Sequence, residues 1–323
     1  MKIKFYLINI FRFLASYLSY PFVFMNKSIN KNEEIKILDY LFQYIQSNYY
    51  TNSIANKTKT HRNFTIQLFN LIKKKKLNNF LNYYFIQKIF FVHNRLYIIF
   101  QLLSLRLSKR WNLWKRLLVE NSVGKPLRFF IYPFSSGNRI RQVYHIKKFI
   151  DWSSIDISKI DLVFEFGGGY GCMASIFQKL SKKIKYIIYD TREVLLLQYY
   201  YLKLNNCDVS FVLPNKNIFL INNLFKLKKI FSQKKHKKKL LIMNWSFSEI
   251  PVYERVKIES LIYKFDYIII SFQDKFENIN NIKYFKELKS KLKKYQFEVH
   301  MEDILTMKLS SKVNHYYFFA KNV

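Results

Sequence analysis

The chain contains only six glycines, and four of them fall within positions 167–171. They follow the apolar run Leu162–Phe166 and lead into Gly171–Leu180, where apolar residues recur at helical spacing. Glycine lets the backbone turn sharply and approach a ligand closely, and the first N–H groups of a helix have no partner within it. The stretch therefore predicts a strand, a tight turn and a helix that bind a ligand together.

Two sequence patterns can be tested against this turn. A dinucleotide-binding turn has glycines at its first, third and sixth positions, but the sixth position counted from Gly167 is Cys172. The pattern E-x-G-x-G-x-G, in contrast, is complete. It resembles the first motif of class I S-adenosylmethionine-dependent methyltransferases. The resemblance implies that the cofactor S-adenosylmethionine contacts Glu165, Gly167, Gly168, Gly169 and Gly171.

An acidic residue ends the next apolar run. Asp190 follows Ile184–Tyr189, and a carboxylate at this place can accept hydrogen bonds from both hydroxyls of a ribose. We therefore expect Asp190 to bind the cofactor. Class I methyltransferases often have a second acidic residue after the third strand, near adenine. The corresponding region Leu213–Asn217 has none, so Asn215 or a backbone carbonyl is expected there instead.

Strand and helix patterns alternate from about residue 160 onward. This alternation predicts an α/β fold with a Rossmann-like, mostly parallel sheet, and we assign residues 121–323 to the methyltransferase domain. Phe297–Met301 and His315–Ala320 are expected to add an antiparallel edge. The other predicted strands are Leu162–Phe166, Ile184–Tyr189, Val209–Leu213, Leu240–Met243 and Tyr267–Ser271.

Residues 1–120 have a different pattern and predict a helical N-terminal region, serving as a cap or an oligomerisation element. Apolar residues at three- and four-residue spacing predict helices at Ile35–Ser47, Thr65–Lys74, Leu77–Leu105 and Ser108–Val119. Phe5–Met25 is apolar, but Arg12 and Pro21 interrupt it, so we expect a buried or interfacial helix rather than a membrane span. This segment keeps peripheral membrane contact open.

The formal net charge is +34. Such a charge suits a nucleic-acid or membrane partner, but it is spread along the chain, whereas a dedicated nucleic-acid binder usually concentrates its charge. We therefore expect no nucleic-acid partner. The two local runs, Lys73–Lys76 and Lys234–Lys239, are ordinary solvated faces or phosphate and lipid contacts. Cys172 and Cys207 have neither metal-ligand nor disulfide spacing, and no metal site is predicted.

Three segments are similar to the sugar O-methyltransferases encoded near bacterial surface-polysaccharide genes. They are Glu120–Pro126 with Ser136–Tyr144, Glu165–Gly171 with Asp190, and Asn244–Pro251. The resemblance implies methyl transfer to a hydroxyl of a saccharide or nucleotide-sugar during surface-glycan synthesis. It places the protein in the cytoplasm or at the inner face of the membrane. Lys125 and His145 depart from the family pattern.

The expected reaction and the expected places of residues in the fold suggest roles for individual residues. Asn244 and Trp245 are expected beside the cofactor. A sugar hydroxyl must lose its proton during the reaction, and Glu249 and His145 are the two candidate bases. Capping of the helix that begins near Tyr253 is the structural alternative for Glu249. The residues expected to contact the acceptor are Arg141, Gln142 and Tyr144.

Two other functions remain open from the residues alone. One is an RNA methyltransferase, although Asn244-Trp-Ser-Phe247 lacks the two prolines typical of enzymes that methylate amino groups of nucleic acids. The other is a methyltransferase-fold scaffold without activity in glycan assembly. The complete glycine motif and Asp190 argue against the scaffold.

Overall fold

The computed structural model describes residues 29–47, 59–90, 92, 94–212, 216–233, 238–308 and 311–323. These residues form two compact units. Unit 1 comprises Met1–Lys147, Gly169–Lys179 and Arg192–Cys207, and unit 2 comprises Lys148–Gly168, Leu180–Thr191 and Asp208–Val323. The chain therefore changes unit inside the glycine turn, between Gly168 and Gly169. The predicted boundary at residue 120 falls within unit 1.

An eight-stranded sheet forms the centre of unit 2, in the order β11-β12-β8-β7-β3-β4-β6-β5. Neighbouring strands from β8 to β5 pair in parallel, whereas β12 runs antiparallel to both β8 and β11. The predicted α/β fold class, with a mostly parallel sheet and an antiparallel edge, is confirmed. The strands are β3 (Leu162–Phe166), β4 (Lys185–Tyr189), β5 (Val209–Ser210), β6 (Ile218–Ile221), β7 (Lys239–Asn244), β8 (Tyr267–Gln273), β11 (Phe297–Asp303) and β12 (His315–Asn322).

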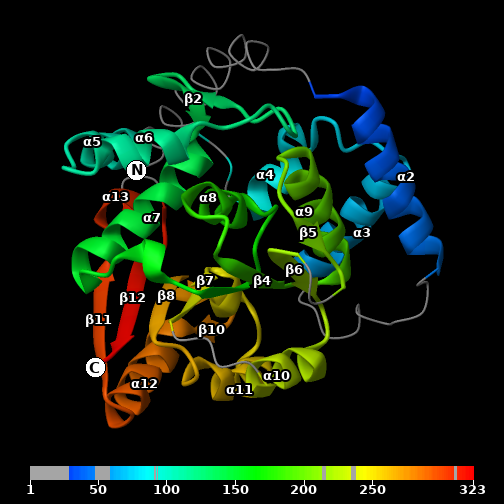
Figure 1. Cartoon of the computed structure of the whole chain (residues 1–323). Coiled ribbons are helices and arrows are strands. Elements are labelled where there is room, and N and C mark those ends of the chain that lie inside the picture. The colour runs from blue at the N-terminus through cyan, green and yellow to red at the C-terminus, as the bar shows by residue number, and fades with distance from the viewer. Residues whose placement is uncertain are drawn as a thin grey trace. The chain divides into compact units, whose positions relative to one another are not determined.

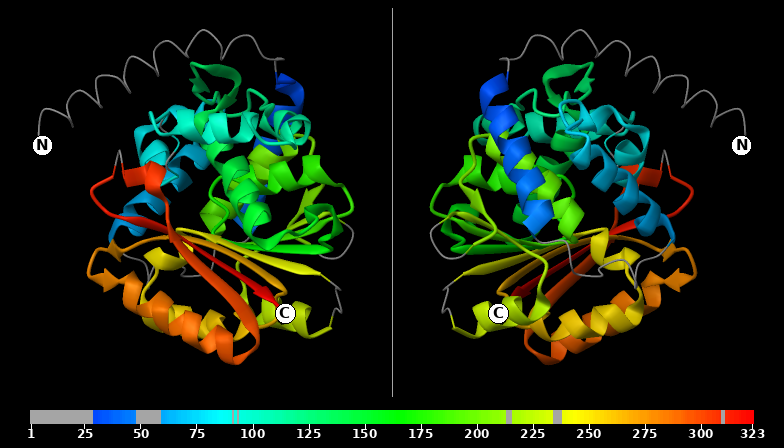
Figure 2. Two further views of the ribbon diagram at one scale, coloured as in Figure 1. Left: turned by 90° about the vertical axis from the view of Figure 1, so that its left-hand side faces the viewer. Right: turned by 90° about the vertical axis from the view of Figure 1, so that its right-hand side faces the viewer.

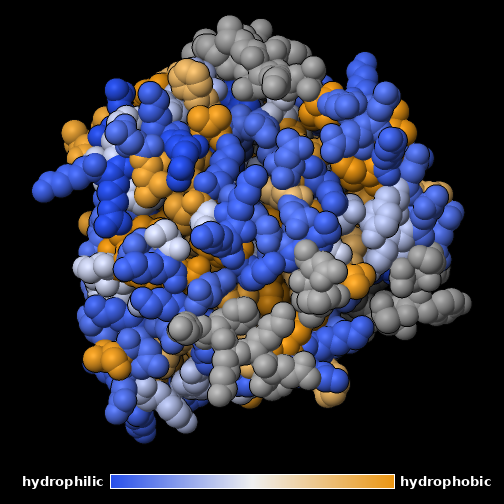
Figure 3. Space-filling view, viewed as in Figure 1, coloured by the Kyte–Doolittle hydropathy of each residue, from blue (hydrophilic) through white to orange (hydrophobic). Residues whose placement is uncertain are grey.

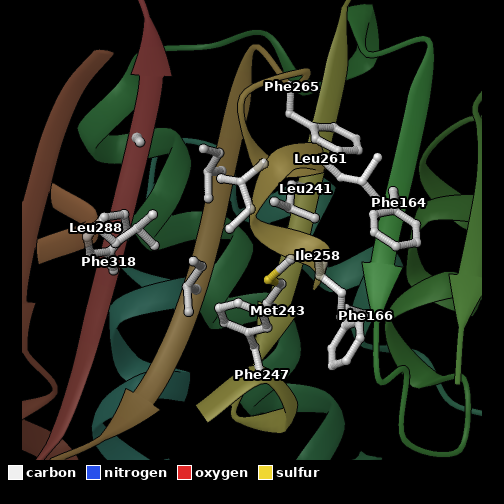
Figure 4. Packing of buried hydrophobic residues seen from close by; sticks show 14 of the residues in the cluster. Phe164, Phe166, Leu241, Met243, Phe247, Ile258, Leu261, Phe265, Leu288 and Phe318 are labelled. Atoms are coloured by element: carbon white, nitrogen blue, oxygen red, sulfur yellow. The ribbon is translucent and has the colours of Figure 1, made fainter. Parts of the chain in front are cut away.

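Three helices of unit 2, α10 (Leu224–Gln233), α11 (Val252–Ile262) and α12 (Asn281–Lys294), lie along one face of this sheet (Figures 1 and 2). Between them and the strands lies a buried apolar cluster that includes Phe164 and Phe318 (Figure 4). Alternate residues of β3, such as Phe164 and Phe166, belong to it because successive side chains of a strand point to opposite faces. Its burial stabilises the sheet that carries the site.

Five short elements also belong to unit 2. They are η2 (Ile157–Lys159), η3 (Ser246–Glu249), the hairpin of β9 (Lys275–Phe276) and β10 (Ile279–Asn280), and α13 (Leu305–Lys308). Of these, η3 is separated from β7 by the single residue Trp245, so the chain makes one tight turn before α11 begins.

Unit 1 is mainly helical. Within it, α9 packs against α2 and α3, and Phe80 lies edge-on to Tyr170, Tyr200 and Tyr201. Its elements are α2 (Lys31–Ser47), α3 (Lys59–Lys73), η1 (Phe80–Asn82), α4 (Tyr84–Ile89), α5 (Ile98–Arg106), α6 (Trp111–Leu118), β1 (Arg128–Phe129), β2 (Tyr132–Ser136), most of α7 (Gly137–Ser153), α8 (Cys172–Leu180) and α9 (Arg192–Leu204).

The single helix predicted over Leu77–Leu105 is wrong, because this stretch forms η1, α4 and α5 with irregular backbone between them. Buried Asn94 explains one interruption. Its side-chain Nδ2 donates to the carbonyl oxygen of Arg128 at 2.8 Å, and its Oδ1 accepts from the backbone N–H of Gly137 at 3.0 Å. An amide that bonds two distant backbone groups competes with the regular helix ladder.

The third strand of the sheet was also misplaced. The predicted strand Val209–Leu213 is reduced to the two-residue β5 at the sheet edge, and the interior strand that pairs with β4 is β6 at Ile218–Ile221. Asn215, Phe5–Met25 and most of Lys234–Lys239 lie outside the described residues. Within the described residues, no helix is both long and apolar enough to cross a membrane.

We predict that Asn94→Ala lowers the free energy of unfolding by about 2–3 kcal/mol, because two buried backbone groups lose their hydrogen-bond partner. Asn78→Ala is the control, since the Asn78 side chain is exposed. Urea unfolding followed by circular dichroism measures both. Equal stability of the two variants would contradict the structural role of Asn94.

Candidate functional site

Polar residues gather where neighbouring parallel strands of unit 2 end. Glu165 is the penultimate residue of β3, Asp190 follows β4 directly, and Asn244 ends β7. Because β3 pairs with β4 on one side and with β7 on the other, the strand order reverses at β3. In open parallel sheets, ligands bind beyond the carboxyl ends of the strands at such a switch point. The three residues therefore mark the candidate site.

The glycine turn begins at this switch point and needs glycine at specific positions. Gly167, Gly169 and Gly171 have φ values of +72°, +55° and +95°, a region that side chains disfavour. A Cβ on Gly167 would lie 2.2 Å from the Cβ of Ser246. The Gly167 N–H donates to the carbonyl oxygen of Tyr189 at 2.9 Å. The turn is thus fixed between the ends of β4 and β7.

Within unit 1, the later glycines allow other close approaches. A Cβ on Gly171 would lie 3.2 Å from Cγ of Leu202 in α9. The carbonyl oxygen of Gly169 accepts a hydrogen bond from Nε2 of Gln198 at 2.9 Å. The second half of the turn is therefore held by α9, and α8 begins at Cys172.

Glu165 is buried and receives a hydrogen bond from the Tyr186 hydroxyl at 2.8 Å. Burial raises its pKa to about 8, an effect that the bond from Tyr186 opposes and the nearby charge of Asp190 reinforces. Glu165 is accordingly a neutral carboxylic acid at pH 7. Its hydrogen bond with Tyr186 links β3 to β4.

Asp190 lies half-buried beyond β4. Its backbone N–H donates to the carbonyl oxygen of Ile221 at 3.2 Å, and its Oδ1 accepts from the Thr191 N–H at 2.7 Å. These bonds fix the carboxylate at the end of β4. A fixed carboxylate at this place can accept hydrogen bonds from vicinal hydroxyls.

The residues after β7 adopt an uncommon conformation. Trp245 has φ +61°, which is strained for a bulky side chain, and its buried indole Nε1 donates to Nδ1 of His315 at 3.0 Å. The Ser246 hydroxyl donates to the carbonyl oxygen of Phe166. Asn244 accepts a bond from Ser271 through Oδ1, while no partner of its buried Nδ2 is found among the described residues. That amide donor is available to a ligand.

Glu249 ends the η3 turn and is partly exposed. Gln273 donates to its Oε1 at 3.5 Å. Buried Arg255 stabilises this turn, because its guanidinium donates to the carbonyl oxygens of Ser248 at 2.7 Å and Ile250 at 3.0 Å. The Glu249 carboxylate therefore lies on a turn whose backbone is fixed by hydrogen bonds.

The predicted residues of α7 lie in unit 1, and two of them are fully buried. The guanidinium of Arg141 donates to Asn138 at 2.6 Å and to the Tyr97 hydroxyl at 3.3 Å. His145 has no exposed surface, and its burial, reinforced by the charge of Arg141, lowers its pKa well below the usual value. Gln142 and Tyr144 are partly exposed. The acceptor and base roles assigned to these four residues stay predictions.

Sequence reasoning missed two features of the site. The misplaced third strand hid Asn222 and Asn223, which follow β6 and occupy the position at which Asn215 was expected. The sequence analysis also gave no role to His315, which accepts a hydrogen bond from Trp245 although the two residues are 70 positions apart in the sequence. The alternation of strand patterns could have located β6, but no local pattern points to His315.

Comparison with known protein families found no match, and no curated protein matches the sequence. Among solved structures, magnesium protoporphyrin IX methyltransferase from Synechocystis PCC 6803, solved with bound SAM, is 13% identical over 70% of this chain and 97% of its own, with a TM-score of 0.39. The methyltransferase domain of bacterial CtHen1 is 17% identical over 55% and 96%, with a TM-score of 0.39. StiE O-MT residues 942–1257 are 11% identical over 58% and 74%, with a TM-score of 0.38. The choice of ligand therefore depends on the residues of the site.

We predict that Glu165→Gln changes the pH dependence of stability. Between the usual pKa of 4.5 and the raised value of about 8, the folded wild type keeps a proton that the unfolded chain has released. Its free energy of unfolding therefore falls as pH rises through this range and levels off above it. Glutamine has no such group, so the variant gains up to about 1.4 kcal/mol per pH unit relative to the wild type.

Urea unfolding at pH 5, 7 and 9 measures this difference. Glu287→Gln on the exposed side of α12 is the charge-matched control. Parallel pH profiles of the wild type and Glu165→Gln would contradict a raised pKa for Glu165.

Proposed function

We propose that the protein is an S-adenosylmethionine-dependent O-methyltransferase that methylates a hydroxyl of a saccharide or nucleotide-sugar in surface-glycan synthesis. One observation carries the cofactor assignment. The glycine turn starts at the switch point of the sheet, and Asp190 stands at the end of the neighbouring strand. A turn and a carboxylate so arranged suit a nucleoside that carries a charged amino-acid tail.

The residues at the strand ends fit this cofactor. Gly167 lets the turn lie directly against Ser246, because a Cβ on Gly167 would lie 2.2 Å from the Cβ of Ser246. Asp190 would bind the ribose hydroxyls, and the glycine turn would lie along the methionine part. Buried Nδ2 of Asn244 offers a further donor for a polar group of the cofactor.

Bound S-adenosylmethionine supplies an electrophilic methyl group on its sulfonium. The protein must then orient the acceptor hydroxyl and remove its proton, and positioning and a base are both substantial contributions to rate. Glu249 suits the role of base because it is partly exposed on the turn after β7. His145 is less suited, since it has no exposed surface in unit 1.

The proposal of a sugar acceptor depends on the resemblance of three sequence segments. In the first of them, Glu120–Pro126 with Ser136–Tyr144, some residues support the fold and others are exposed. Glu120 accepts from the Ser136 N–H at 2.6 Å and pairs with buried Arg128, so it holds the β1–β2 hairpin. The guanidinium of Arg141 is engaged inside unit 1. Gln142 and Tyr144, both partly exposed, are therefore the stronger candidates for contact with the acceptor.

The first test is cofactor affinity. We expect Asp190→Asn to weaken S-adenosylmethionine binding about 10- to 100-fold, because charge-assisted hydrogen bonds to the ribose are lost. Isothermal titration calorimetry of the purified chain measures the affinity, with Glu287→Gln as the charge-matched control. Unchanged affinity of Asp190→Asn would remove Asp190 from the site.

The second test is transfer. Glu249→Gln is expected to lower methyl transfer to the accepted sugar about 10²- to 10⁴-fold, while the affinity for S-adenosylmethionine stays the same. The control is Glu254→Gln, because Glu254 pairs with Lys257 on α11 at 2.8 Å. Transfer of labelled methyl groups is followed with monosaccharides, nucleotide-sugars and RNA as acceptors. Full activity of Glu249→Gln would exclude it as the base, and labelling of RNA alone would contradict the sugar acceptor.

A further inference from the structure

Unit 1 exposes large apolar side chains on α5 and on the β1–β2 hairpin. Phe100 and Leu103 of α5 and Leu107, its C-cap residue, recur at three- and four-residue spacing and so lie on one side of the helix. Leu107 is 86% exposed and Phe134 in β2 is 62% exposed. Scattered exposed apolar residues are common, but a contiguous group indicates a surface that binds a partner.

The hairpin tip is apolar where a turn is ordinarily polar. Arg128 and Phe129 of β1 pair with β2 so closely that the turn consists of Phe130 and Ile131. Tight turns favour Gly, Asn, Asp and Pro because these residues suit the backbone and the solvent. Ile131 is exposed. An exposed Phe-Ile tip does not stabilise the protein in water, and its apolar side chains suit insertion into an apolar phase.

Direct contacts join the helix surface to the hairpin. The Arg106 guanidinium lies 6.0 Å from the centre of the Trp111 ring. The ring centres of Trp111 and Tyr132 are 6.3 Å apart, and those of Tyr132 and Phe134 are 5.4 Å apart. Figure 1 shows α5, α6 and β2 next to one another. Aromatic rings with one polar edge, such as Trp and Tyr, favour the boundary between lipid and water.

The stretch that contains α5 and α6 carries basic side chains and no acidic ones. Residues 40–119 contain no Asp or Glu, so no acidic side chain within this stretch offsets its lysines and arginines. In Figure 3, hydrophobic side chains lie among strongly hydrophilic ones over α5, α6 and β2. The exposed basic residues of this surface are Arg106, Lys109, Arg110, Lys115 and Arg116.

We propose that α5, α6 and the β1–β2 hairpin form a docking surface for an anionic lipid bilayer. The apolar hairpin tip and the exposed face of α5 enter the boundary region of the bilayer, and the basic side chains bind the lipid headgroups. Each basic residue near an anionic membrane adds electrostatic attraction, and burial of the apolar side chains strengthens the binding further. This surface consists of residues other than Phe5–Met25, and the proposal does not depend on the proposed methyl transfer.

Co-sedimentation of the full chain with vesicles tests the proposal. The wild type is expected to bind phosphatidylcholine vesicles that contain phosphatidylglycerol and to bind pure phosphatidylcholine much more weakly. The double variant Ile131→Glu/Phe134→Glu is expected to lose about 10-fold or more of its vesicle affinity. Both substituted side chains are exposed, and circular dichroism verifies that the variant is folded.

Phe225→Glu is the matched control, because Phe225 on α10 in unit 2 is 77% exposed. It is expected to bind vesicles like the wild type. Equal binding of the double variant and the wild type would overturn the proposal and assign attachment to another part of the chain. Loss of self-association by the double variant, with no vesicle binding by the wild type, would identify a second copy as the partner. Binding of RNA without binding of vesicles would overturn the proposal as well.

Discussion

The site depends on one steric constraint, the contact between the backbone of Gly167 and Ser246. A Cβ at Gly167 would lie 2.2 Å from the Cβ of Ser246, so the segments that follow β3 and β7 approach each other this closely only because glycine has no side chain. The Ser246 hydroxyl, which donates to the carbonyl oxygen of Phe166, then ties the two strand ends together. This contact fixes the glycine turn at the switch point of the sheet.

The same contact explains the strained segment after β7. Ser246 can reach Phe166 because Trp245 adopts φ +61°, a conformation that costs about 1–3 kcal/mol. Surrounding bonds hold Trp245 in place: its N–H donates to the carbonyl oxygen of Ser271, and its indole donates to His315. Strain held in this way at the end of a strand is typical of functional sites, where it pre-organises groups for a ligand.

The sequence predicted those parts of the structure that local patterns determine. Phe164 and Ile187 lie in apolar runs that end at the glycine turn and at Asp190, so the central strands and the turn between them could be located. The break in the helix at Asn94 could not, because its partners are the backbones of Arg128 and Gly137, distant in sequence. Burial of Arg141 and His145 was also beyond reach, since α7 carries polar residues on the face that unit 1 encloses. Tertiary packing decided these features.

The central claim is that the turn from Glu165 to Gly171, with Asp190, binds S-adenosylmethionine and not a dinucleotide. Calorimetric titration of the wild-type chain with S-adenosylmethionine and, separately, with NAD tests this claim most directly. The account predicts saturable binding of S-adenosylmethionine at one site per chain and no binding of NAD, because Cys172 stands where a dinucleotide turn requires glycine. Binding of NAD alone, or of neither ligand by folded protein, would contradict it.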